Sequence, residues 1–164
     1  MANSAFIREA KNLILSQLQD DDEIVKCLGL NPNEDRDNLI YTRLFPHYFM
    51  PATESEVKTY ILVEVEIPEM RTHYLNGVNK NVVYPIITFY ILCHQSDMRL
   101  RLPKTSAVRT DYIAELIDNK YNGKDLLGLK NLELISNTAH NLSDTYRYRQ
   151  LVFKGADFND SYCG

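Results

Sequence analysis

The chain has 164 residues, of which 45% are hydrophobic and 24% charged, a composition typical of one globular domain with a real core. Its formal net charge of -4 argues against a general nucleic-acid coat, because such proteins need a concentrated positive surface to neutralise phosphates. Three widely spaced cysteines without a CxxC pair indicate reduced thiols in a cytosolic setting, and they predict neither a disulfide framework nor a zinc site.

The first predicted element is an amphipathic helix that Ser4 can cap. Its apolar side recurs at spacings of three and four residues and consists of Phe6, Ile7, Ala10, Leu13, Ile14 and Leu18. Charges such as Arg8 and Lys11 lie among them, which argues against a signal peptide or a membrane span. The acidic residues 20–22 then predict the start of a second, shorter helical turn, which Gly29 is placed to end.

A polar connector at residues 31–38 precedes a short predicted strand at 39–41 and an aromatic loop, LFPHYF, at 44–49. Pro46 within this loop and Pro51 after it exclude a regular central strand there. Residues 57–67 alternate between apolar and polar side chains, so we predict a half-buried strand. The pair Asn76-Gly77 predicts a hairpin with the next strand, and its long tip is expected to reach a neighbouring molecule.

The following strand, residues 81–95 (NVVYPIITFYILCHQ), is the most informative segment, since both of its alternating faces are apolar. This pattern predicts a central strand that is covered on both sides. Only two helices of useful length are predicted, so we expect neighbouring copies of the protein to supply part of the cover. The pattern therefore favours an assembling structural protein over a solitary enzyme.

Residues 96–110 are polar and basic and predict a surface loop or short strand, because Pro103 excludes a continuous helix. Thr110 is expected to cap a helix that ends at Asn122-Gly123, and strands are predicted at 132–138 and 146–154. The order of elements predicts an α+β fold with a mostly antiparallel sheet and a long central hairpin. We expect one domain over residues 1–155 and a loose tail over 156–164.

No catalytic, cofactor or metal site is predicted. Cys93 and His94 are adjacent on a strand and so point to opposite faces, and the glycines are isolated rather than grouped in a phosphate-binding loop. Asp111 and Glu115 share one helix face with Asp118, a pattern that favours a solvated face over a metal or acid–base site. The alternative left open is a small metal-dependent hydrolase or nuclease that uses Asp111, Glu115 and His94.

Two groups of cations are candidates for binding a partner. Arg99, Arg101, Lys104 and Arg109 concentrate positive charge in an acidic chain, which fits an acidic protein surface or passing DNA as well as an ordinary solvated loop. The sequence Tyr146 to Arg149 alternates tyrosine and arginine, so a strand there places the tyrosines on one face and the arginines on the other. Both residue types are enriched at interfaces, although a sheet edge explains the pattern equally well.

This order of features resembles the small neck proteins of tailed bacteriophages, in particular the tail-terminator and tail-completion group. The resemblance covers most of the chain: the leading helix, the LFPHYF loop, the long hairpin, the helix TDYIAELIDNKYNG, the segment LELIS and the closing strand YRYRQLVF. It implies an α+β sheet flanked by helices, a closed ring that is usually a hexamer, and no catalytic residues or cofactors. It also implies a place in the virion neck, after assembly in the host cytoplasm.

The partners implied by the resemblance are further copies of the chain, the tail tube protein and head connector or adaptor proteins, with DNA in the lumen as a further contact and no membrane. The predicted interface residues are Met70, Arg71, His73, Tyr74, Lys80, Arg99, Arg101, Lys104, Arg109, Arg147 and Arg149. Another connector or head-completion ring and a cytosolic adaptor for one acidic protein are the remaining alternatives. The LFPHYF loop matches no role in the family.

Overall fold

The computed structural model describes residues 3–52 and 55–157, and it is built around a five-stranded sheet. The strand order is β1-β2-β3-β7-β6, and all neighbours are antiparallel except β1 and β2. The strands span Leu44–Phe45 (β1), Thr59–Leu75 (β2), Val78–His94 (β3), Leu129–Asn141 (β6) and Tyr146–Asp157 (β7). The prediction of an α+β fold with a long central hairpin is confirmed.

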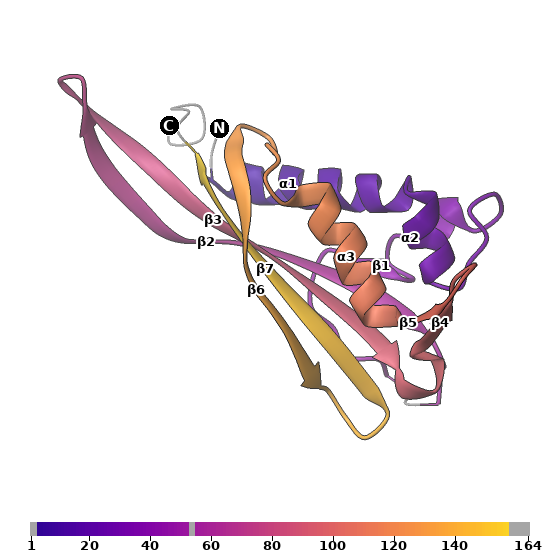
Figure 1. Ribbon diagram of the computed structural model, residues 1–164. Coiled ribbons are helices and arrows are strands. Elements are labelled where there is room, and N and C mark those ends of the chain that lie inside the picture. The colour runs from indigo at the N-terminus through magenta and orange to yellow at the C-terminus, as the bar shows by residue number, and fades with distance from the viewer. Residues whose placement is uncertain (1–2, 53–54, 158–164) are drawn as a thin grey trace.

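Three helices cover one face of the sheet: α1 (Asn3–Gln19), α2 (Asp22–Cys27) and α3 (Arg109–Tyr121) (Figure 1). Residues such as Ile61, Phe89 and Leu151 point from the strands into this layer and join the apolar sides of the helices in the main core. The ring of Tyr121 stacks on Phe89 at 5.3 Å between centroids. In the described part of the chain, no helix combines the length and apolarity needed to cross a membrane.

Two predicted helix starts are wrong by a small margin. Helix α1 already includes Asn3, so Ser4 lies within its first turn. Helix α3 begins at Arg109, and Thr110 is buried within it instead of capping it. The chain enters α3 directly from a strand, and the Arg109 backbone N–H donates to the carbonyl of Met98 at 2.6 Å, which replaces a side-chain cap.

The start of α2 follows the prediction. The carboxylate of Asp21 accepts hydrogen bonds from the backbone N–H groups of Glu23 and Ile24, which would otherwise have no partner within so short a helix. Burial acts to raise the pKa of Asp21, but hydrogen bonds from Lys120 and the backbone outweigh it and hold the pKa below its ordinary value. Gly29 follows the helix with φ of +78°, as its predicted role as a stop requires.

The central hairpin is more regular than expected. The ladder between β2 and β3 continues past the predicted end at Ile67 as far as Leu75, where only Asn76 and Gly77 form the turn. Their φ values of +53° and +81° suit the tight turns that match strand twist. Pro68 is accommodated by a register shift between Glu66 and Glu69, which lets the strand continue past its predicted end.

Other strand boundaries also differ. The strand predicted at residues 39–41 is absent there, and the short edge strand β1 lies instead at the start of the LFPHYF loop, next to Pro46. Strand β6 begins at Leu129, and β7 runs on to Asp157. Gly155 lets β7 pack closely against β6, since a Cβ at this position would lie 3.0 Å from the Leu132 side chain. Residues 158–164 of the predicted tail lie outside the described residues.

The second face of the sheet has its own core at one end. Tyr60, Leu62, Leu92 and Tyr146 are buried there beneath Phe45 and Phe49 of the aromatic loop. The rings of Phe45 and Phe49 lie 4.2 Å apart, and Phe49 meets Tyr60 edge-on at 5.2 Å. The central strand is therefore covered on both sides, as predicted, but the chain itself supplies this part of the second cover. At this end of the sheet the cover needs no neighbouring copy, and the expectation that copies supply another part of the cover stays a prediction.

A polar clamp holds the aromatic loop against the outer edge of β2. Lys11 of α1 donates to the carbonyl of Pro46 at 2.6 Å and to Glu64 Oε2 at 2.9 Å. The other carboxylate oxygen of Glu64 accepts from the backbone N–H of Tyr48 at 2.8 Å. Both charged side chains are largely buried, so this pair links helix, loop and strand more effectively than a solvated ion pair would.

Phe49→Ala should lower the free energy of unfolding by about 2 kcal/mol, because it removes half of the aromatic cover over Tyr60 and Leu92. Met50→Ala, next to it but exposed, should change stability by less than about 0.5 kcal/mol. Urea denaturation followed by tyrosine fluorescence measures both. Equal effects of the two substitutions would contradict an intramolecular second core.

Candidate interaction surfaces

The outer half of the β2–β3 hairpin, residues 69–84, forms an arm that projects beyond the rest of the sheet (Figure 1). Strand β7 ends at Asp157, opposite Val83, so from there to the turn β2 and β3 pair only with each other among the residues that the structure describes. Large apolar side chains are exposed along the arm, including Met70 at 58%, Tyr74 at 74% and Val78 at 56%. Apolar side chains gathered on a projection are typical of a protein–protein contact.

The two faces of the arm differ in charge. Strand register places Met70, Thr72 and Tyr74 on one face together with their partners Val83, Asn81 and Asn79, and none of these side chains is charged. Thr72 Oγ1 donates to Asn81 Oδ1 at 2.8 Å across this face. Uncharged polar groups around methionine and tyrosine are the composition expected at the centre of an interface.

The opposite face of the arm carries Glu69, Arg71 and His73. Arg71 pairs with Glu69 at 3.2 Å, and a ring nitrogen of His73 lies 3.0 Å from the hydroxyl of Tyr84. The Tyr84 ring also has the guanidinium of Arg71 at 5.8 Å and the ammonium of Lys154 at 5.4 Å from its centroid. These contacts order the base of the arm.

The arm residues, which were predicted as one group, therefore divide between two faces. Met70 and Tyr74 lie on the uncharged face, whereas Arg71 and His73 lie on the charged one. The backbone of Lys80 pairs with that of His73, and its side chain lies outside the described residues.

The second surface is a small hairpin formed by β4 (Arg99–Arg101) and β5 (Ser106–Val108), which we call the basic hairpin. Arg99 and Arg101 are exposed on β4, and Lys104 is exposed in the turn. No carboxylate of the described residues forms an ion pair with any of the three cations. Their charge is therefore available to a partner.

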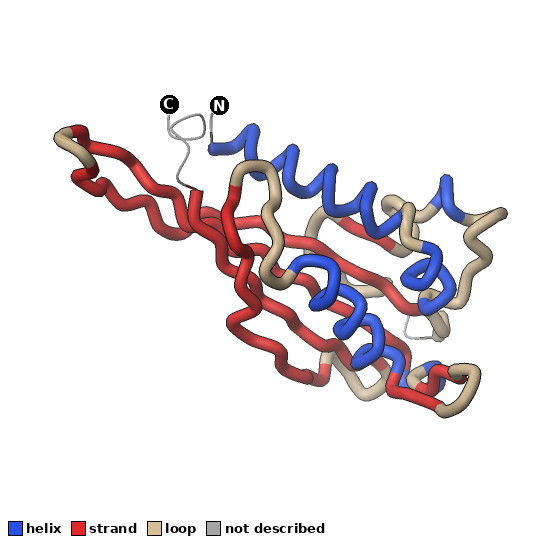
Figure 2. The backbone as a smooth tube through the Cα atoms, turned by 45° about the horizontal axis from the view of Figure 1, so that its top comes forward, coloured by secondary structure: helices blue, strands red, loops and turns tan. Residues whose placement is uncertain are grey.

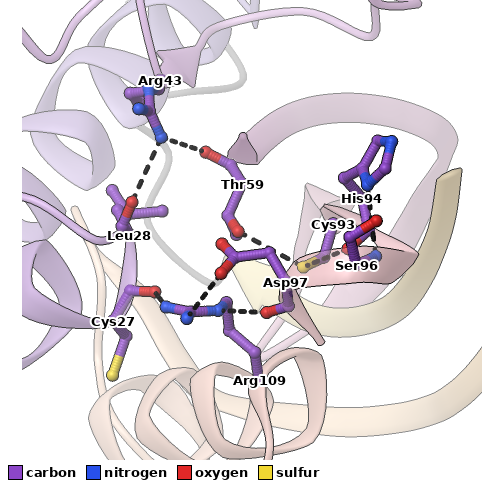
Figure 3. A network of polar contacts seen from close by, with 9 residues as sticks. All are labelled: Cys27, Leu28, Arg43, Thr59, Cys93, His94, Ser96, Asp97 and Arg109. Carbon is purple, nitrogen blue, oxygen red and sulfur yellow. Dashed lines mark hydrogen bonds and ion pairs between the residues drawn. The ribbon is translucent and has the colours of Figure 1, made fainter. Parts of the chain in front are cut away.

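Arg109 fixes the base of the basic hairpin and does not belong to its surface (Figure 3). Its side chain is only 8% exposed and donates to the carbonyl of Asp97 at 2.7 Å, to the carboxylate of Asp97 at 3.1 Å and to the carbonyl of Cys27. Through these bonds the hairpin is joined to α2. The prediction that Arg109 contributes to an interface is corrected, because its guanidinium is buried and its donors are used by Asp97 and Cys27 within the subunit.

The same network contains two thiols (Figure 3). Burial raises the pKa of Cys27 to about 11, against the opposing charge of Arg109, and burial also raises the pKa of Cys93. Thr59 donates to the Cys93 sulfur at 3.3 Å. Both cysteines are free and buried, and their raised pKa values disfavour the reactive thiolate.

Between the basic hairpin and β7 lies a hollow of about 490 Å³, whose lining includes Met98, Thr110 and Arg147. Arg149 also lines it, donating to Asp111 at 2.8 Å and to Asn137 at 2.9 Å. Arg99 lines an adjoining depression that shares Met98 and Val108. The fold thus brings Arg99 and Arg147, more than forty positions apart in the sequence, to one side of the molecule.

The alternation of tyrosines and arginines in β7 is confirmed. Arg147 and Arg149 pair with residues of β3 that face the helices, whereas Tyr146 and Tyr148 face the aromatic loop. Arg147 is exposed, and Arg149 is engaged within the subunit. Arg147 is therefore the better candidate for contact with a partner.

The residues of the hydrolase alternative are not brought together. Asp111 lies on the helix side of the sheet and is bound to Arg149, whereas His94 packs edge-on against the Tyr146 ring at 5.2 Å on the opposite side. Within residues 3–52 and 55–157, no three His, Cys, Asp or Glu side chains are close enough to share a metal ion. The geometry does not support the proposed acid–base site.

Comparison with known families agrees with the phage-like layout. A family model named YomW matches residues 21–155, from the turn before α2 to Gly155 in β7. The chain belongs to the YomW family. The family name is of the Bacillus prophage kind, and the protein is accordingly phage-related. The matched residues include nearly all of the sheet, the arm and the basic hairpin. No curated protein matches the chain.

Arg109→Ala should lower the free energy of unfolding by about 3 kcal/mol, because it leaves the buried carbonyl of Cys27 and the carboxylate of Asp97 without their donor. Arg109→Lys should recover only part of the loss, since an ammonium cannot span partners that a guanidinium fork reaches. Arg101→Ala on the hairpin surface should be neutral within about 0.5 kcal/mol. Thermal and urea unfolding provide the measurement, and a neutral Arg109→Ala would contradict the anchoring role.

Proposed function

We propose that this phage-related protein is a non-enzymatic structural component of the head–tail neck, which forms a ring, terminates the tail tube and docks it to the head connector. The observation that carries the proposal is the arm. It extends from a subunit whose core is already complete, so its exposed apolar side chains contribute little to the stability of the subunit. The exposure of these side chains is explained by contact with another molecule.

The neighbouring copy of the chain is the partner that best fits the uncharged face of the arm. A closed ring requires a heterologous contact, in which a surface of one subunit meets a different surface of the next. A projecting rigid hairpin is suited to this geometry because it reaches past its own subunit. The ordered register and tight turn reduce the conformational entropy that such a contact would otherwise cost.

The layout also supports a neck role. An α+β sheet flanked by helices, with a long hairpin and no assembled catalytic group among the predicted residues, is what the resemblance to tail terminators and tail-completion proteins implies. Another connector or head-completion ring is the second candidate, since the arm would serve it equally well. In both roles the tail tube, the head connector and DNA in the lumen are the expected contacts.

Removal of the arm tip should abolish assembly and leave the fold intact. The strand register permits deletion of the four residue pairs from Thr72↔Asn81 to Leu75↔Val78, so that Arg71 and Val82 are joined by the same Asn76-Gly77 turn. We expect the full chain to form a ring by native mass spectrometry and the shortened chain to form none, with an unchanged melting temperature.

A point substitution refines this experiment. Tyr74→Ser on the arm should weaken assembly by about tenfold or more, as expected for an aromatic residue at an interface centre. Ile135→Ser removes a comparably exposed apolar side chain from β6 and serves as the matched control. A full chain that stays monomeric at high concentration, or a shortened chain that still forms rings, would contradict the proposal.

A further inference from the structure

Opposite charges gather at one end of the molecule. The basic hairpin carries three cations and no carboxylate. Beside it, α2 and its flanking turns form an acidic segment, residues 20–37, with seven carboxylates against two cations. Figure 2 shows the loop after α2 and the basic hairpin extending from the same end of the molecule, away from the arm tip. We call this region the charged end.

Most of the acidic charge faces outward. Asp21 is engaged as the cap of α2 and pairs with Lys120 at 2.7 Å, and Arg36 pairs with Asp22 and lies 3.9 Å from Asp20. Several carboxylates are nevertheless exposed, namely Asp20, Asp22, Glu23, Glu34 and Asp37. The nearby cations are Lys26, Arg36, Lys120 and Lys124, four against the seven carboxylates of the segment, so the segment presents excess negative charge to solvent.

A hollow beside this segment contains unused hydrogen-bonding groups. It has a volume of about 680 Å³ and is lined by Asp20, Glu23, Gln17 and Tyr121, among others. Tyr121 is only 3% exposed, and neither its hydroxyl nor Gln17 Oε1 has a hydrogen-bond partner in the described structure. Buried polar groups usually find partners, and the carboxylates that line the hollow suit a donor-rich cation such as a guanidinium.

We propose that the charged end is a self-complementary surface that pairs two copies of the chain, with the basic hairpin of each copy on the acidic segment of the other. The cations of the hairpin have no ion-pair partner in their own described subunit, and exposed carboxylates lie at the same end of the molecule. Complementary patches side by side on one surface can both be satisfied when a second copy is related by a two-fold axis.

This contact is separate from the ring proposed above. It uses none of the arm residues, and the bonds of Arg109 to Cys27 and Asp97 hold its two halves in fixed relative positions. A pair of single subunits and a pair of rings are both compatible with it. The measurable signature is the same in either case, because loss of the contact halves the mass.

The test reverses the charge of each half. In one full-length variant Arg99, Arg101 and Lys104 become Glu, and in the other Asp20, Asp22 and Glu23 become Lys. Sedimentation at low salt should show each variant at half the mass of the unmodified protein, and a 1:1 mixture should regain the full mass. Raising the salt to about 1 M should also halve the unmodified mass, since the Debye length falls to about 3 Å.

A matched control reverses Arg8, Lys58 and Lys130, which lie outside the charged end, to Glu, and so changes the net charge equally. Its mass should stay unchanged, and circular dichroism should show all variants folded. An unchanged mass in either charged-end variant, a halved mass in the control, or failure of the mixture to reassociate would overturn the proposal. If only the hairpin variant loses mass, the hairpin binds a different acidic surface. These outcomes leave the arm-dependent ring assembly to be judged separately.

Discussion

The pairing of β2 with β3 is the interaction on which the rest of the structure depends. Its inner half is buried on both faces, by helices on one side and by the aromatic loop on the other, so the two strands cannot shift register without exposing apolar groups. The outer half continues the same ladder into solvent. The register of the arm is therefore set by the core, because one continuous hairpin serves both.

The remaining polar contacts position surfaces around this hairpin. Lys11 and Glu64 hold the aromatic loop at the edge of β2, which completes the second core and leaves the subunit self-sufficient there. Arg109 performs a similar task at the other end, where it joins α2 to the base of the basic hairpin. Each of these charges is used inside the subunit, whereas Arg99, Arg101 and Lys104 remain at the surface. The molecule thus presents an uncharged arm face at one end and a charged surface at the other.

The sequence predicted an element correctly where the local pattern of residues was strong. Three such predictions were correct: the strand around Ile91 and Leu92 that is covered on both faces, the turn at Asn76-Gly77, and the alternation in β7. Tertiary contacts decided the rest. The strand predicted to end at residue 67 continues through a register shift, and Arg109 was grouped by charge with surface cations although one of its partners, Cys27, lies far away in the sequence. The role of Phe45 and Phe49 as the second cover could not be inferred, since nothing local indicates which face a loop will cross.

The most direct test of the neck assignment is the length of tail tubes made without the protein, measured by electron microscopy of particles from cells that lack it. Loss of a terminator leaves growth of the tube unchecked, so the account predicts tubes longer than normal that are not joined to heads. The chain without its arm tip should fail to restore normal length. Tubes of normal length, already joined to filled heads, would contradict the account.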